Sequence, residues 1–269
     1  DSSNFGGQGF SLPFDGNTPI GEDQSGREND WTPHNFSGLV SLDKATGALP
    51  ILNTVNGGNV ATAGVRTDAY SANLVLALPL VGIATDVSNQ VNSGTAEKVI
   101  TDTGATATLD ESNFYGNSFD FDGSNDDLTC TISGGLGSGD FTIEYWINQD
   151  TLSDYQTHLS STRGTTGFNV GTDGSGDFVW ADDQGSGIGR RIEVVGAITT
   201  GVWYHWAFVR ASNVITGYLN GVAIATYSSS INYSDSAFSI GALDSSSEWT
   251  NGKLSDVRIY VGVAKYTSN

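Results

Sequence analysis

The chain has 269 residues, and its 11 Lys and Arg against 30 Asp and Glu give a formal net charge of −19. This charge argues against nucleic-acid binding, which requires a basic surface for the phosphates, and against docking on an anionic membrane. With 35 glycines and only 15% charged residues, the composition favours a β-rich protein with many turns over a helical bundle. The sequence contains no apolar run of about 18 residues, so no membrane insertion is predicted.

Residues 1–71 are predicted to form an irregular arm or inter-module linker. They are rich in Gly, Asn and Pro and show no sustained period of 2 or 3.6. Isolated aromatic residues such as Phe14 and Trp31 indicate that the arm packs on another surface, because a free linker has little use for them. Residues 72–269 are predicted to be a separate domain.

This second region contains a series of short strand patterns. The first, over 74–78, is wholly apolar, as expected of a strand buried on both faces. The run 141–149 alternates and places four large residues on one face, namely Phe141, Ile143, Tyr145 and Ile147. Further strands are predicted over 118–122, 128–132, 203–210, 214–219, 222–227, 238–240 and 254–260.

Asn220 and Gly221 separate two of these runs. Both residues tolerate a positive φ, so the pair predicts a type I′ β-hairpin. About a dozen short strands with Gly, Ser and Asp turns, and no amphipathic helix, predict an all-β fold: a two-sheet antiparallel jelly-roll sandwich. Cys130 is the only cysteine, which excludes an intrachain disulfide, and it is predicted to be a buried strand residue.

Five segments follow one another in an order typical of one family. They are FDGSNDDL at 121–128, DFTIEYW at 140–146, WYHWAFVR at 203–210, YLNG at 218–221 and GKLSDVRIY at 252–260. The series resembles the laminin G-like, concanavalin A-like lectin/glucanase domain over about residues 72–269. The resemblance implies a jelly roll in which the first and last strands, 74–78 and 254–260, pair with each other.

The flanking segments carry a second resemblance. Residues 5–20, 23–36 and 262–269 look like parts of the modular virion proteins of marine tailed phages. This resemblance implies an extracellular, virion-surface location, as in a tail fibre, adhesin or other appendage. It also implies that the partners are a host-surface glycan or other virion subunits, and that the chain forms a homo-oligomer or a repeated module.

An acidic turn at 120–127 holds four Asp and one Asn, which are the hard oxygen ligands that Ca²⁺ prefers. The spacing is not that of an EF-hand. The family resemblance implies a Ca²⁺ site near the paired first and last strands, with Asp122, the Gly123 carbonyl and Asp256 as ligands. The alternative is an exposed turn whose Asp side chains bond their own backbone.

Sugar rings stack on aromatic side chains while neighbouring polar groups bind the hydroxyls. Candidates for this role are Tyr155, Trp180 beside Asp182, Tyr233 and Trp249, with the glycine-rich stretch 171–180 as the predicted presenting loop. The alternative for each aromatic residue is packing in the core.

No catalytic constellation is recognisable, so the chain is predicted not to be an enzyme. Glu144 and Asp150 share a face, but six residues of strand put them roughly 20 Å apart, beyond the about 5–9.5 Å that glycoside hydrolysis needs. The predicted function is therefore a lectin-like module that binds host-surface glycan or a neighbouring virion subunit. The alternatives are a purely structural capsid-decorating or fibre-stacking subunit and, less favoured, a glycan-cleaving enzyme.

Overall fold

The structure is a computed structural model that describes residues 29, 68–109, 117–152, 154–161, 166–183 and 188–267. The chain divides into two compact units, Asp1–Ser71 and Ala72–Asn269. The predicted arm, with Phe14 and Trp31, therefore lies outside the described residues except for Asn29 and 68–71.

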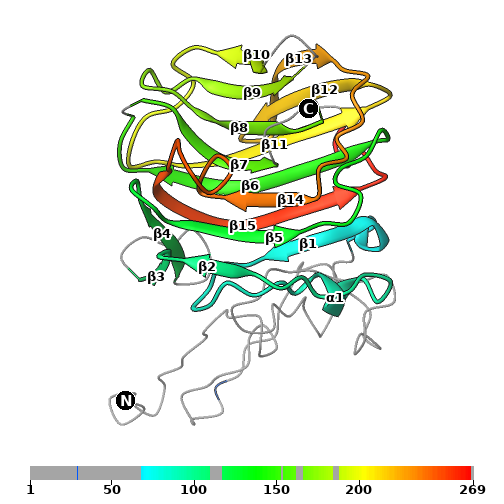
Figure 1. Ribbon diagram of the computed structural model, residues 1–269, viewed down its shortest axis with the longest axis horizontal. Coiled ribbons are helices and arrows are strands. Elements are labelled where there is room, and N and C mark those ends of the chain that lie inside the picture. The colour runs from blue at the N-terminus through cyan, green and yellow to red at the C-terminus, as the bar shows by residue number, and fades with distance from the viewer. Residues whose placement is uncertain are drawn as a thin grey trace. The chain divides into compact units, whose positions relative to one another are not determined.

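Two antiparallel sheets form the second unit (Figure 1). The strands of the eight-stranded sheet are, in spatial order, β13 (Val222–Ser228), β12 (Val214–Leu219), β11 (Trp203–Ala211), β6 (Phe141–Gln149), β15 (Asn251–Val261), β4 (Ser118–Asp122) and β3 (Thr106–Thr108), with β1 (Leu74–Leu78) also paired to β15. Those of the seven-stranded sheet are β10 (Ile188–Val194), β9 (Phe178–Asp183), β8 (Phe168–Thr172), β7 (Gln156–Ser161), β14 (Ala237–Ile240), β5 (Asp127–Thr131) and β2 (Thr101–Thr103). The predicted all-β sandwich is thus confirmed.

Helical structure in the described part of the chain is limited to the 3₁₀ turn η2 (Ser71–Asn73) and the single turn α1 (Ser88–Val91). Neither of these helices has the length to cross a bilayer.

The pairing of the first and last strands is confirmed. In the β1–β15 pair, Leu76 lies opposite Ile259 and Leu78 lies opposite Val257, and all four side chains are buried. The predicted hairpin is confirmed as well, because Leu219 of β12 pairs with Val222 of β13. The two turn residues between them have positive φ, 51° at Asn220 and 82° at Gly221, as a type I′ turn requires.

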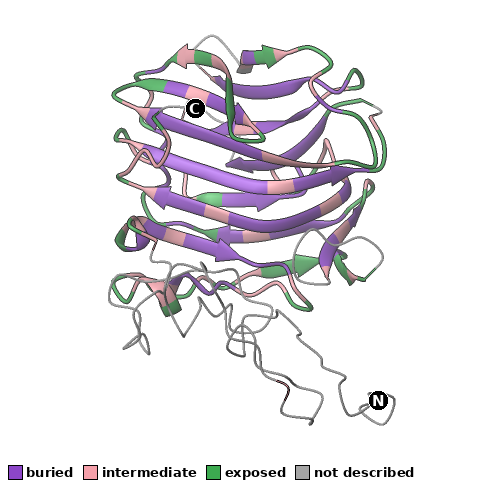
Figure 2. Ribbon diagram, turned by 180° about the vertical axis from the view of Figure 1, so that it is seen from behind, coloured by how far each residue is buried: buried purple, intermediate pink, exposed green. Residues whose placement is uncertain are grey.

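The core between the sheets is rich in aromatic side chains. The ring of Trp180 stacks on that of Phe168 with centroids 4.8 Å apart, and Phe178 lies 4.2 Å from Trp206. Phe168 and Trp180 belong to neighbouring strands of one sheet, whereas Phe178 of β9 meets Trp206 of β11 in the other sheet, so this second contact joins the two layers. Seen from behind, buried residues run along most of the strands (Figure 2).

Candidate functional site

The outward face of the seven-stranded sheet carries small side chains with hydroxyl groups. In β14 and β5, Phe238 and Cys130 belong to the core, so the alternating neighbours Ser239 and Thr129 face outward. Ser239 pairs with Thr129, and Thr129 pairs in turn with Thr101 of β2. Strand pairing therefore places three hydroxyl groups in one row across three strands.

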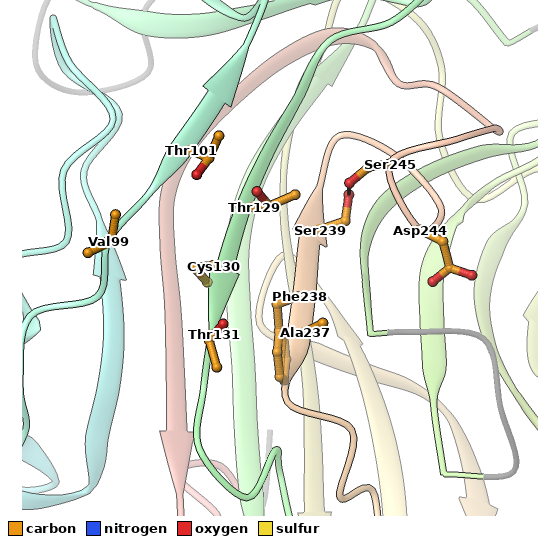
Figure 3. A pocket seen from close by; sticks show the side chains of 10 residues that line it. All are labelled: Val99, Thr101, Thr129, Cys130, Thr131, Ala237, Phe238, Ser239, Asp244 and Ser245. Atoms are coloured by element: carbon orange, nitrogen blue, oxygen red, sulfur yellow. Dashed lines mark hydrogen bonds between the residues drawn. The ribbon is translucent and has the colours of Figure 1, made fainter.

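A depression of about 490 Å³ opens over this row (Figure 3). The residues that line it are Val99, Thr101, Thr129, Cys130, Thr131, Ala237, Phe238, Ser239, Asp244 and Ser245. One wall is the turn after β14, which folds back over the sheet because the Ser160 hydroxyl donates to the Ala242 carbonyl at 3.0 Å. In that wall, the Ser245 hydroxyl lies 3.4 Å from the Ser239 hydroxyl.

A second depression, of about 500 Å³, adjoins the first and shares Val99 and Thr131 with it. The other residues that line it are Val75, Gly94, Thr95, Ala96, Glu97, Lys98, Ile132 and Ser133. We refer to the two adjoining depressions together as the trough. Its polar lining consists mainly of hydroxyl groups, which can both donate and accept hydrogen bonds.

Cys130 contributes to the trough wall without offering a reactive thiol. The residue is buried, as the sequence predicted, and burial raises the pKa of its thiol to about 12. The thiolate that would act as a nucleophile is therefore not populated near neutral pH.

The sequence prediction was wrong for Trp180 and Asp182, and also for Tyr233, which is buried. The stretch expected to be a presenting loop includes the end of β8 and the start of β9, and Trp180 has no exposed surface. Asp182 is equally buried, and it accepts hydrogen bonds from Trp180 Nε1 at 3.2 Å, Tyr233 Oη at 2.6 Å and Arg191 Nε at 2.9 Å. Both residues belong to the core because Phe178, Trp180 and Asp182 alternate on the inward side of β9.

Tyr155 and Trp249 lie nearer the surface but outside the lining of the trough. Tyr155 is 56% exposed, and the Arg190 guanidinium covers one face of its ring at 4.7 Å from the centroid. Trp249 is half-buried in the segment that Glu248 attaches to Thr157 through a side-chain bond of 3.0 Å. The role of these two residues in sugar binding stays a prediction.

The predicted calcium ligands are not brought together. Asp122 lies opposite Asn251, five residues along β15 from Asp256, which separates the two by roughly 16 Å. Both carboxylate oxygens of Asp256 are bound by Arg258, at 2.8 and 2.6 Å. The Asp122 carboxylate accepts from the Ser124 amide at 2.7 Å, as in the alternative of a turn that bonds its own backbone. The residues present therefore do not fit the ligand set that the resemblance implied, and calcium binding itself stays a prediction.

Another acidic cluster consists of Asp173, Asp177 and Glu193, whose carboxylate oxygens lie within 4.8 Å of one another. The guanidinium of Arg190 ion-pairs with all three, at 2.9 Å from Asp173 and 3.7 Å from Asp177. An arginine thus supplies the positive charge that this cluster requires.

Glu144 and Asp150, the carboxylates that the sequence analysis placed too far apart for glycoside hydrolysis, are each held by a basic side chain. Burial alone would raise the pKa of Glu144, but the charges of Lys265 and Arg258 outweigh it and lower that pKa. Glu144 is bound by Lys265 at 2.6 Å and by the Tyr266 hydroxyl, while Asp150 is bound by Lys253 at 2.6 Å. Each carboxylate therefore has a structural partner on the outward side of the eight-stranded sheet.

Sequence reasoning missed the residues of the trough. The sequence did carry one signal for them, because Thr recurs at every second position, at 101 and 103 and again at 129 and 131. This alternation marks one polar face on each of two strands. That these faces adjoin each other, and adjoin Ser239 and Asp244, follows only from the strand order.

Two antiparallel sheets, with the terminal strands paired and a hydroxyl-lined trough on one outward face, define a lectin-like β-sandwich. Residues 122–265, more than half of the chain, match the family described as the concanavalin A-like lectin/glucanases superfamily. The chain belongs to this family. A comparison with curated protein sequences finds no match.

Several solved structures share the fold at low sequence identity. Domain 4 of AbnA, an extracellular GH43 arabinanase from Geobacillus stearothermophilus, in complex with arabinotriose, is 15% identical with a TM-score of 0.56, and the match covers 72% of this chain and 94% of that one. Botulinum neurotoxin type C, which interacts with two ganglioside molecules, is 16% identical with a TM-score of 0.54, covering 71% of this chain and 48% of the toxin chain. The binding domain of botulinum neurotoxin DC in complex with SialylT is 14% identical with a TM-score of 0.53, over 71% and 48%. This chain thus spans about half the length of these toxin chains, and likenesses this remote show the fold alone.

Proposed function

We propose that this protein is a non-enzymatic glycan-binding module and that the trough is its binding site. The observation that carries the proposal is the first depression, whose lining includes five residues with hydroxyl groups: Thr101, Thr129, Thr131, Ser239 and Ser245. Sugars present rows of hydroxyl groups, which such a surface can bind through several short, oriented hydrogen bonds.

The partner class is supported by the relatives with the same fold. They include a domain in complex with arabinotriose, a toxin that interacts with gangliosides, and a binding domain in complex with SialylT. We further propose that the module belongs to an appendage on the outside of a phage virion and recognises the host surface or a neighbouring subunit. The support for that setting is the resemblance of residues 5–20, 23–36 and 262–269 to segments of modular virion proteins.

A glycan-array screen of the full chain tests this function. Thr129→Val removes one trough hydroxyl while keeping the shape and strand propensity of the side chain, so we expect affinity for array hits to fall about 5-fold, the equivalent of one hydrogen bond. Thr216→Val is the matched control, because Thr216 is paired in β12 of the other sheet and does not line the trough.

The screen is repeated with a chelator, which tests the calcium prediction separately. Binding that resists chelation and falls only in Thr129→Val supports the trough as the site. The absence of any glycan hit, together with self-assembly of the chain in solution, would favour the purely structural subunit instead.

A further inference from the structure

The second depression has one wall that belongs to neither sheet. Residues 94–99, which lie between α1 and β2, form this wall, and the rest of the lining comes from Val75 of β1 and from residues 131–133. Val99 and Thr131 also line the first depression, so the two depressions meet at these residues. In Figure 3, Val99 lies on the side of the first depression that is opposite Ser245. The second depression therefore extends the trough on the side of Val99.

The 94–99 wall is attached to the sandwich at both ends. Near its start, the Asn92 side-chain amide donates to the Leu74 carbonyl of β1 at 2.9 Å, and its oxygen accepts from the Gly94 amide at 3.0 Å. Near its end, the Lys98 backbone amide donates to the Asp86 carboxylate at 2.8 Å. These bonds fix the wall relative to β1, so the second depression is formed before any ligand binds.

Asp86 is the centre of the second attachment. One oxygen of its carboxylate accepts from the amides of Ala77 and Ser88, at 3.0 and 2.9 Å. The other oxygen accepts from the Ser88 hydroxyl at 2.9 Å and from the Lys98 amide. Asp86 is only 1% exposed, and hydrogen bonds to a charged acceptor are roughly twice as strong as neutral ones. A single buried carboxylate thus connects the 94–99 wall to β1, which contains Ala77, and to α1, which begins at Ser88.

We propose that the two depressions are consecutive subsites for one extended oligosaccharide, and that Asp86 is a positioning residue for the second subsite. This inference rests on the proposed function and names the length of ligand that the same site takes. The depressions measure about 490 and 500 Å³, and each lies within the about 300–1,000 Å³ typical of ligand pockets. Because they meet at Val99 and Thr131, one chain of sugars can occupy both. Asp86 contacts no ligand itself and acts through the Lys98 amide on the position of the wall.

Oligosaccharides of increasing length test the two subsites. The glycan that binds most tightly on the array is prepared as a series from a single sugar unit upward, and titration calorimetry gives the Kd of the full chain for each member. We expect the affinity to rise about 10-fold or more along the series and to level off once both depressions are filled. A Kd that does not change with length would overturn the two subsites while leaving glycan binding intact.

Asp86→Asn tests the positioning role. The variant keeps the shape of the side chain, but its amide nitrogen cannot accept a hydrogen bond, so it cannot hold both Ser88 and Lys98 as the carboxylate does. We expect the Kd for long members to rise about 5-fold, while short members, which the first depression binds, keep their Kd within about twofold. Asp177→Asn is the matched control, because Asp177 is also buried, accepts from the Gly196 amide at 2.9 Å and does not line the trough. A loss of stability alone would not separate short members from long ones.

A second pair of variants decides the role of Asp86 if Asp86→Asn fails to fold. Lys98→Pro removes the amide hydrogen through which Asp86 holds the wall, whereas Lys98→Ala keeps it, and neither changes the bonds of Asp86 to Ala77 and Ser88. We expect only Lys98→Pro to remove the gain in affinity from added sugar units.

The outcomes separate the two proposals. Equal losses of affinity at every length in Asp86→Asn, or the same length dependence in Lys98→Pro and Lys98→Ala, would overturn the positioning role. An array without any glycan hit would remove the proposed function and this inference with it.

Discussion

Asp182 was predicted from the sequence to contact a ligand, and the structure instead predicts that it stabilises the core. The substitution Asp182→Ala leaves the donors Trp180 Nε1, Tyr233 Oη and Arg191 Nε without their shared acceptor. Asp182 is fully buried, and water cannot replace it without a rearrangement of the surrounding rings. A large loss of stability is the expected result.

The size of the effect follows from the two buried donors that lose their acceptor, since Trp180 and Tyr233 have almost no exposed surface while the Arg191 side chain is 23% exposed and keeps access to water. An unsatisfied buried donor costs about 1–3 kcal/mol, so a total loss of about 3–5 kcal/mol is expected, a large part of the about 5–15 kcal/mol that stabilises a typical domain. At a urea m-value of about 2–3 kcal/mol/M, the unfolding midpoint shifts down by roughly 1–2.5 M. Tyr233→Phe removes only one donor to the carboxylate and its contact with Ser229, so we expect a loss of about 1.5–3 kcal/mol.

Urea unfolding, followed by the fluorescence of the buried tryptophans, measures these shifts. Asp183→Ala is the matched control, because Asp183 is the next residue of β9 and is only half-buried. The reasoning is refuted if the free energy of unfolding of Asp182→Ala lies within about 1 kcal/mol of that of the unsubstituted chain while glycan binding is lost. A ligand-binding residue at the surface would behave in that way.

Three further predictions concern other parts of the sandwich. Burial lowers the pKa of His158 to about 3, so the folded state binds a proton there less readily than the unfolded chain does. Urea titrations should therefore show that the free energy of unfolding falls by about 2 kcal/mol from pH 7 to pH 5. The fall should be smaller in the variant His158→Gln. In Gly171→Ala the new Cβ would lie 1.9 Å from the Gln156 carbonyl oxygen, so the melting temperature should drop by several degrees. Gly139 has open space around it, so the control variant Gly139→Ala should have the same melting temperature as the unsubstituted chain. Glu144→Gln weakens the bond to Lys265, so the Lys265 amide should exchange its hydrogen about 10-fold faster, and an unchanged rate would contradict the role given to that ion pair.

Strands with a clear side-chain period could be predicted from the amino-acid sequence. The alternation over 141–149 and the Asn220-Gly221 pair are local signals, because side-chain direction and turn geometry depend only on neighbours in the chain. Strands β7 and β8 were not predicted, since polar residues such as Gln156 and Thr172 are buried there. Gln149 Nε2 bonds both of them, at 3.1 and 2.7 Å, and this contact joins three strands. When a polar residue is buried because it bonds partners that are remote in sequence, the surrounding sequence shows no hydrophobic pattern that would predict the strand.

The candidate site depends on the order of the strands in the sheet. Thr101, Thr129 and Ser239 are remote in sequence and form one row because β2, β5 and β14 are neighbours in the sheet. The same reason explains why the predicted calcium ligands are not brought together, since Arg258 binds Asp256, and five strand positions separate Asp256 from Asn251, the partner of Asp122. Residue types fix which chemistry is available, but the distances between them come from strand pairing, which a single sequence does not encode locally.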